Sequence, residues 1–251
     1  MGLTKKEIKR ICTALGDLFL PRVCVVCGEA LTLDERHICL GCLSELPYTH
    51  FWDRRDNPMA QKFNAALRES IPDSVPQMFE RGAALFFYNS ETQYQNIPKS
   101  LKYGSDKAAG RYFAAKLGAV LASSPLFADV DTVIAVPLHP LRKFSRGFNQ
   151  AEIIATEVAK ALGAPLRTDI LRRVRYTTTQ TRKGVGEKAK NVKGAFKAKM
   201  PRGNPITAKH ILLVDDTFTT GSTLASCHEE LRRVFPPSVR ISVATLAYVG
   251  D

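Results

Sequence analysis

The stretch HILLVDDTFTTGSTL, residues 210–224, constrains the fold of this chain more than any other. Its four apolar residues, 211–214, show no alternation, which is typical of a strand buried on both faces of a parallel sheet. Apolar residues recur at helical spacing from Leu224 onward, so we expect a helix that begins near Ser222. Together these features predict an α/β domain with a ligand site at the carboxyl edge of its sheet.

The residues between the expected strand and helix suit a ligand that carries a diol and a phosphate. Asp215 and Asp216 provide two acceptors for a diol, and hydroxyl and backbone N–H donors bind phosphate. A helix N-terminus adds a positive dipole at the same point. The candidate phosphate-binding residues are Thr217, Thr219, Thr220, Gly221, Ser222 and Thr223.

Two other interpretations of this stretch explain less of it. An apolar run followed by an acid also occurs in P-loop NTPases, but the sequence contains no G-x-x-x-x-G-K-[ST] motif. An ordinary strand-to-helix turn with Ser222 or Thr223 as N-cap would explain one hydroxyl. It would not explain five hydroxyls or the paired acids.

A second basic loop and a long polar segment lie before this stretch. Residues 133–136 predict another buried strand, and Arg142 and Arg146 follow it, before a helix at 151–162. We expect a second anion-binding loop there, although basic residues of a crossover can also simply face water. Residues 176–190 have no apolar pattern and predict a lid that contains Lys183 and Lys188, with disorder as the alternative.

Four cysteines near the N-terminus predict a metal site. Cys24 and Cys27 form one C-x-x-C pair, and Cys39 and Cys42 form a second pair after eleven residues. This spacing is typical of a structural zinc ion held by four thiolates, with no position open for catalysis. Disulfides and paired redox motifs fit a cytosolic chain less well. Cys12 and Cys227 lie on apolar helical faces, so we expect them in the core.

The distribution of charge and of apolar residues divides the 251-residue chain and limits its partners. We expect an N-terminal helix and finger at 1–50, a connector at 51–80 and the α/β domain at 81–251. The net charge is +12, and residues 166–210 hold thirteen Lys and Arg against two acids. Such a segment implies a polyphosphate ligand or nucleic acid as partner. The chain lacks an export signal and a long apolar run, which predicts a cytoplasmic protein without membrane insertion.

Three of these motifs, in this order, resemble the ComF family of bacterial competence-associated proteins: the two C-x-x-C pairs, VPLHPLRKFSRGFNQAE and ILLVDDTFTTGSTL. Residues 175–196 also resemble that family's loop. The resemblance implies a type I phosphoribosyltransferase fold, a mainly parallel sheet flanked by helices, with a small N-terminal four-cysteine zinc finger. It also implies a link to the uptake of single-stranded DNA.

The resemblance further implies that the site binds phosphoribosyl pyrophosphate (PRPP). Asp215 and Asp216 would hold the ribose hydroxyls, with Mg²⁺ bridging to the pyrophosphate, and residues 217–223 would hold the 5′-phosphate. Arg142 and Arg146 would neutralise the pyrophosphate, and the lid lysines would close over it. A transferase would displace pyrophosphate at ribose C1, but no residue is an obvious base for an acceptor. The alternative is a non-catalytic adapter that binds nucleic acid or a DNA-uptake protein.

Overall fold

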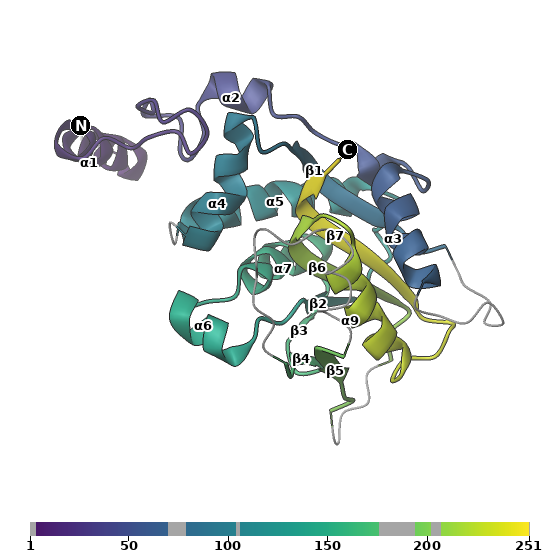
Figure 1. Cartoon of the computed structure of the whole chain (residues 1–251). Coiled ribbons are helices and arrows are strands. Elements are labelled where there is room, and N and C mark those ends of the chain that lie inside the picture. The colour runs from purple at the N-terminus through teal and green to yellow at the C-terminus, as the bar shows by residue number, and fades with distance from the viewer. Residues whose placement is uncertain (1–3, 70–78, 104–105, 176–193, 202–206, 251) are drawn as a thin grey trace.

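A computed structural model describes residues 4–69, 79–103, 106–175, 194–201 and 207–250 of the chain (Figure 1). Its helical elements are α1 (Lys5–Phe19), α2 (Leu40–Ser44), η1 (Phe51–Asp53), α3 (Pro58–Arg68), η2 (Gln93–Gln95), α4 (Asn96–Tyr103), α5 (Lys107–Ser123), α6 (Pro140–Arg146), α7 (Gln150–Leu162) and α9 (Ser222–Arg232). Its strands are β1 (Gly82–Tyr88), β2 (Thr132–Ala135), β3 (Leu166–Arg167), β4 (Leu171–Arg173), β5 (Phe196–Ala198), β6 (His210–Phe218) and β7 (Arg240–Val249).

The main sheet is parallel throughout its described strands, as the sequence predicts. Its order is β1-β7-β6-β2-β3, so the two C-terminal strands lie between strands from earlier in the chain. Helices α5 and α7 cover one face, while α3 and α9 cover the other. The short strand at 171–173 lies outside this sheet, in a separate antiparallel pair, β4 with β5. The pattern did not predict β3 and β5, because two or three residues are too few to show a period.

The connector contains a helix, α3, which packs on the sheet. Asn57 caps it and Pro58 occupies its first turn. Met59 and Phe63 are fully buried, and α3 lies against β1 and α9. The division of the chain at residues 50 and 80 stays a prediction.

The strand at the centre of the sheet is longer than its apolar run. The sequence predicts a strand at 211–214, but β6 continues through Phe218. Its neighbour β7 is ten residues long and pairs with this extension, up to Phe218 with Tyr248, whereas β2 last pairs at Val214. The extension therefore has β7 on one side and, among the described strands, no strand on the other.

The basic loop before α7 also contains a helix that the sequence did not predict. Pro140 occupies the first turn of α6, and the His139 side chain accepts a hydrogen bond from the N–H of Leu141. Gly147 ends the helix with a φ of +80°, a left-handed conformation that favours glycine. The expectation of a loop throughout this stretch was wrong because a seven-residue helix is too short to show a clear apolar stripe.

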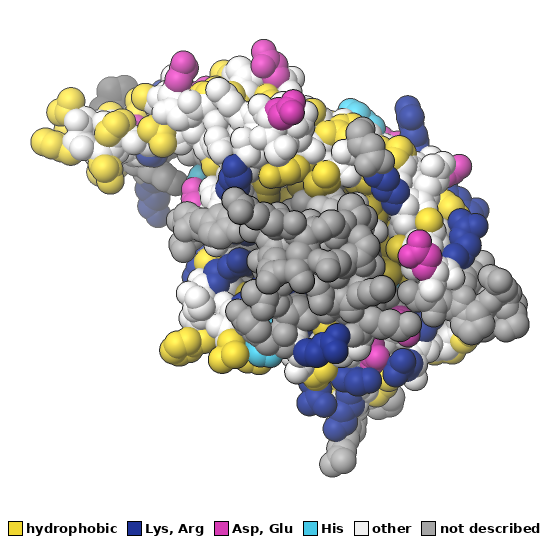
Figure 2. Space-filling view, in the orientation of Figure 1, with side chains coloured by type: hydrophobic (Ala, Val, Ile, Leu, Met, Phe, Trp, Pro, Cys, Tyr) yellow, Lys and Arg dark blue, Asp and Glu magenta, His cyan; other side chains and the backbone are white. Residues whose placement is uncertain are grey.

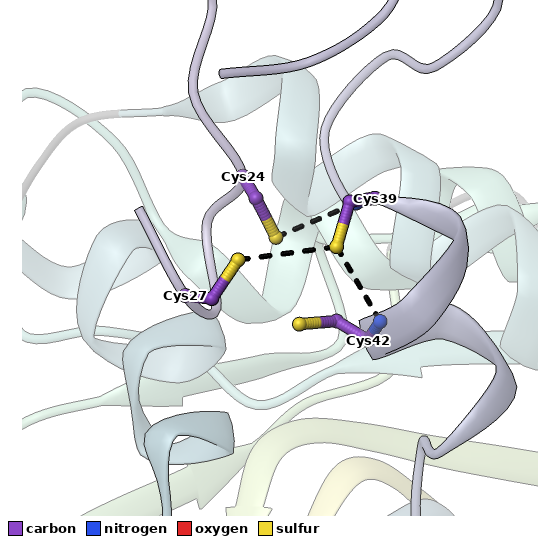
Figure 3. Close-up of side chains that lie close together, drawn as sticks. All are labelled: Cys24, Cys27, Cys39 and Cys42. Carbon is purple, nitrogen blue, oxygen red and sulfur yellow. Dashed lines mark hydrogen bonds between the residues drawn. The ribbon is translucent and has the colours of Figure 1, made fainter. Parts of the chain in front are cut away.

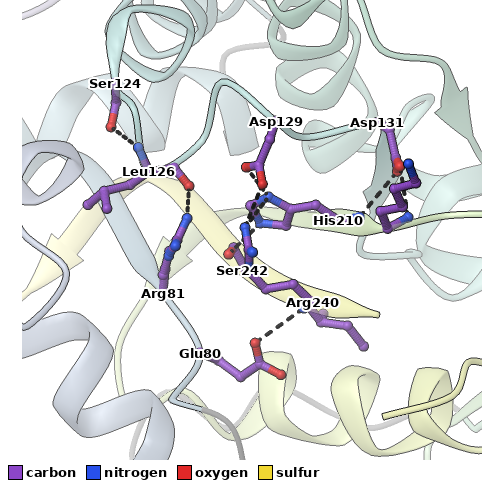
Figure 4. Close-up of polar contacts among 11 residues, drawn as sticks. Glu80, Arg81, Ser124, Leu126, Asp129, Asp131, His210, Arg240 and Ser242 are labelled. Atoms are coloured by element: carbon purple, nitrogen blue, oxygen red, sulfur yellow. Dashed lines mark hydrogen bonds and ion pairs between the residues drawn. The ribbon is translucent and has the colours of Figure 1, made fainter. Parts of the chain in front are cut away.

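Polar side chains join the amino ends of β6 and β7 (Figure 4). The His210 ring lies 2.7 Å from Asp129 Oδ1 through Nδ1 and 2.7 Å from Ser242 Oγ through Nε2. Arg240 donates to the second oxygen of Asp129, also at 2.7 Å. Because His210 and Ser242 are buried, this Asp–His–Ser series has no exposed nucleophile and ties strands together instead.

The N-terminal helix exposes its apolar face (Figure 2). Leu15, Leu18 and Phe19 are 59%, 76% and 85% exposed. Cys12 lies on the same helix and is exposed too, so its predicted place in the core was wrong, whereas Cys227 is buried as expected. An apolar face in the sequence does not guarantee that another element covers it. Among the described helices, none combines the length and the hydropathy that crossing a membrane requires.

Candidate ligand site and metal centre

The turn between β6 and α9 depends on a glycine. Gly221 has a φ of +75° and is the N-cap of α9. A Cβ there would lie 2.8 Å from Cζ of Phe218, so a larger residue would meet both backbone strain and a clash. The predicted start of the helix at Ser222 is confirmed, and no side chain caps it. The ordinary-turn interpretation is wrong, because neither Ser222 nor Thr223 is the N-cap.

The hydroxyl groups of this turn are therefore not used to cap the helix. Thr220 Oγ1 and Ser222 Oγ lie 3.1 Å apart, and Thr219 is exposed. Thr217 Oγ1 is buried and has no hydrogen-bond partner among the described residues. A buried hydroxyl without a partner loses about 1–3 kcal/mol of hydration that nothing replaces. A ligand oxygen would relieve this cost.

The two acids point to opposite faces of the sheet, because they are consecutive residues of a strand. Asp216 faces the side of α4, where Lys102 Nζ lies 3.1 Å from its Oδ2. Asp215 faces the side of α9 and accepts a hydrogen bond from the backbone N–H of Asp216 at 2.8 Å. The sequence shows two adjacent acceptors, but only the strand extension separates them in this way.

The electrostatics around Asp215 are unfavourable to its charge. Burial, and then repulsion from Asp216, raise the pKa of Asp215 to about 7. Lys102 and Arg173 act in the opposite direction. Burial, and then the Arg142 cation, lower the pKa of Arg173. Like charges thus lie together on both the acidic and the basic side of the site, an arrangement that is common in functional sites.

The predicted pyrophosphate residues, Arg142 and Arg146, are linked to the acid pair only through other residues in the described part of the chain. Arg142 is near Arg173, and Arg146 Nη1 donates to Gln150 Oε1 at 2.8 Å. Gln150 in turn donates to the carbonyl of Leu101 at 3.4 Å. The structure therefore connects α6 and α7 with the end of α4. Lys183 and Lys188 lie outside the described residues.

Two site residues were missed in the sequence. Lys102 lies near the end of α4, and Arg173 is the last residue of the short strand β4. Neither has a motif of its own, and each reaches the acids only through tertiary packing. The one available signal was chemical: paired acids without a nearby cation require compensation from elsewhere.

The four predicted metal ligands lie together (Figure 3). The sulfur atoms of Cys24, Cys27, Cys39 and Cys42 all lie within 4.8 Å of one another. Cys27 and Cys39 Sγ are 3.9 Å apart, close to the S–S separation of about 3.8 Å that follows from tetrahedral Zn–S bonds. This cluster can hold a zinc ion.

Backbone N–H groups favour the thiolate form of Cys24, whereas burial raises the pKa of Cys42. Burial opposes ionisation of Cys24, but hydrogen bonds from the N–H groups of Cys27, Cys39 and Val26 lower its pKa to about 7. The N–H of Cys42 also points to Cys39 Sγ, at 3.4 Å. The thiolate form is the one that binds metal, so the donor set and its surroundings both suit zinc.

Comparison with known proteins assigns the domain. A family model for the phosphoribosyl transferase domain matches residues 145–250. Competence protein F from Haemophilus influenzae is 32% identical over 111 residues, which cover 44% of this chain and 48% of that protein. DNA utilization protein YhgH from Salmonella typhi is 33% identical over 111 residues, 44% of this chain and 47% of that protein. These matches support a ComF-family protein.

The matches with known proteins cover only part of each chain. The chain spans about half the length of the curated relatives it matches. A solved hypoxanthine phosphoribosyltransferase from Staphylococcus aureus aligns with a TM-score of 0.33 at 20% identity, over 57% of this chain and 64% of that one. The matched domain, the parallel sheet and the four-cysteine cluster agree with the predicted type I phosphoribosyltransferase fold of a ComF protein. Within the matched range lie α7, β6, α9 and β7, which include the acid pair and its turn.

Proposed function

We propose that this ComF-type protein binds PRPP, with Mg²⁺, at the carboxyl end of β6. The proposal rests on polar groups at this end of the strand that repel each other or lack partners among the described residues. Two acids repel each other, the buried Thr217 hydroxyl has no partner among the described residues, and the N–H groups of the first turn of α9 have no side-chain cap. A diol, a phosphate and their cation would satisfy each of these groups.

Each part of the site has a role in this proposal. Asp215 and Asp216 hold the ribose hydroxyls, and the turn at 217–223 holds the 5′-phosphate. Arg142 and Arg146 neutralise the pyrophosphate, with Lys183 and Lys188 from the loop. Mg²⁺ would supply charge neutralisation at the diol and the pyrophosphate. The reaction that such a site supports is displacement of pyrophosphate at ribose C1, and the acceptor would bring its own nucleophile.

Thermal unfolding with millimolar PRPP and Mg²⁺ tests the proposal. We expect a rise in melting temperature, because a ligand that binds only the native state stabilises it by mass action. Asp215→Ala with Asp216→Ala should abolish the rise. Glu69→Ala with Glu91→Ala removes the same charge from exposed positions and should leave the rise intact. A wild-type protein that shows no shift would overturn the proposal.

The β4–β5 hairpin favours a second function, binding of single-stranded DNA by a cytoplasmic adapter in DNA uptake. Arg172, Arg175, Lys197 and Lys199 on or beside this hairpin are exposed, and Lys and Arg are prominent in the corresponding part of the surface in Figure 2. Binding should weaken with salt, and Arg172→Gln with Lys199→Gln should reduce the salt slope by about 1–2. Binding that does not depend on salt would exclude this function.

A further inference from the structure

We propose that α4 is a strut through which the four-cysteine finger positions Lys102 and Gln150 at the ligand site. Zinc binding and PRPP binding are then coupled, a consequence that rests on the function proposed above. Lys102 and Gln150 are positioning residues in this scheme, since each acts on groups that would contact the ligand. Three sets of contacts carry the inference.

The finger is attached to the start of the strut. The Tyr94 hydroxyl in η2, immediately before α4, donates to the carbonyl of Cys42 at 3.0 Å. Asn96, the first residue of α4, donates through Nδ2 to the carbonyl of Val26, also at 3.0 Å. Cys42 is a candidate metal ligand, and Val26 lies between two others. A metal ion that fixes the cysteines therefore fixes both acceptor carbonyls.

The strut itself is short and well packed. Eight helical residues span about 12 Å, and in Figure 1 α4 lies below the finger helix α2. Ile97 and Leu101 are buried at 0% and 1% exposure. Leu101 lies so close to α5 that a Cβ on Gly110 would be 2.3 Å from its Cδ1. A closely packed helix of this kind transmits a displacement of one end to the other rather than absorbing it.

The far end of the strut reaches both halves of the ligand site. Lys102 Nζ pairs with Asp216 on β6 at 3.1 Å. The carbonyl of Leu101 accepts from Gln150, whose side-chain oxygen accepts from Arg146 on α6. One helix end therefore helps to orient an acid of the proposed ribose site and a cation of the proposed pyrophosphate site. Loosening the finger should disturb both at once.

The test removes the finger contacts and leaves the metal ligands and the site intact. Tyr94→Phe with Asn96→Ala deletes one hydroxyl and one amide. Ser100→Ala is the matched control, because the hydrogen bond that its hydroxyl makes among the described residues stays within α4, to the carbonyl of Ile97. Both proteins should retain one zinc per chain. If the double variant loses metal, Tyr94→Phe alone replaces it in the test, because this substitution removes a single oxygen.

Three measurements separate this inference from the proposed function. The first is amide hydrogen exchange of the zinc-loaded proteins without ligand, and we expect about fivefold or faster exchange near residues 100–103 and 214–221 in the double variant only. The second is calorimetric PRPP affinity with Mg²⁺, which should fall about fivefold or more, a usual size for coupling between two sites. Bound PRPP should also slow extraction of zinc by a chelator in the wild type but not in the double variant, because coupling is reciprocal.

The outcomes differ for the two claims. Exchange and affinity that match the wild type in the double variant would overturn the strut while PRPP binding stands. Faster exchange in the double variant, together with no PRPP binding by the wild type, would support the strut and overturn the proposed function. If Ser100→Ala loses as much PRPP affinity as the double variant, the proposed role of α4 would also be overturned. The effect would then come from α4 alone and not from its contacts with the finger.

Discussion

At its amino end, β6 begins with His210, whose two ring nitrogens both have close partners in Asp129 and Ser242. At its carboxyl end, the same strand carries two acids that repel each other and a buried Thr217 hydroxyl that has no partner within the described chain. Both ends are polar and partly or wholly buried. They differ in whether the protein alone satisfies their polar groups.

Whether the protein satisfies its own buried polar groups distinguishes a structural cluster from a ligand site in this fold. Folded proteins satisfy nearly all buried polar groups, so a complete network needs no further partner. An incomplete network that persists in the fold despite its energetic cost indicates a functional site, because perturbed polar groups cluster there. The following predictions test whether the amino end is structural and the carboxyl end functional.

The largest expected effect is at the amino end. His210→Ala removes the buried partner of Ser242 and one of the two described partners of Asp129, so we expect a loss of about 3 kcal/mol in the free energy of unfolding. Urea denaturation at neutral pH measures it. PRPP affinity per folded molecule should stay unchanged. A loss of binding with intact stability would reverse the roles of the two ends.

The second-largest effect is expected at the carboxyl end, where a substitution should raise the free energy of unfolding. The pKa of Asp215 is raised to about 7 in the fold, so the native state holds this proton more tightly than the unfolded chain. Wild-type stability should therefore fall as the pH rises from about 4 to 7, and level off above it. Asp215→Asn removes this dependence on pH. Its free energy of unfolding should be about 2 kcal/mol higher than that of the wild type at pH 8, after allowance for partial exposure.

Urea denaturation of the two proteins at pH 5 and pH 8 measures this difference. At pH 5 the acid is protonated in the fold but largely ionised in the unfolded chain, so the advantage of Asp215→Asn should be about a third of that at pH 8. PRPP binding should weaken in the variant at both values of pH. A variant that is less stable than wild type at pH 8 would contradict the repulsion described for the acid pair.

A smaller effect of pH belongs to the amino end. Burial raises the pKa of Asp129, but hydrogen bonds from His210 and Arg240 outweigh it and hold the pKa below its ordinary value. Its contribution is present above the unfolded pKa of about 4 and is lost as the pH falls below it. Asp129→Asn should cost about 1 kcal/mol at pH 7, because the side chain is half exposed. It should also flatten the acid limb of the stability curve, which unfolding from pH 3 to 7 would record.

The smallest effect on stability is expected at Thr217. Thr217→Val replaces a hydroxyl without a described partner by a methyl group of the same shape, so stability should stay equal or rise by up to about 1 kcal/mol. PRPP affinity should nevertheless fall. Thr245→Val is the matched control, since its hydroxyl already donates to the carbonyl of Ala247 and its loss should destabilise the fold. A destabilised Thr217→Val protein would mean that the carboxyl end is as complete as the amino end.

Much of the fold and part of the site could be predicted from local patterns. Continuous apolar runs gave the buried parallel strands, and helical spacing placed the start of α9 at Ser222. The cysteine spacing predicted a cluster that the structure brings together. These features are encoded within a few neighbouring residues, because period and spacing are local properties.

The α/β class, the parallel sheet, the acid pair and the spacing of the four cysteines follow from the sequence alone, since each is a matter of residue type at fixed spacing. Only the tertiary structure decided which side chains face the acids. The length of β6 depends on its neighbour β7 and sends Asp215 and Asp216 to opposite faces. The packing of α4 between finger and sheet brings Lys102 to Asp216. The HILLVDDTFTTGSTL stretch specifies a site, and distant elements determine its charge.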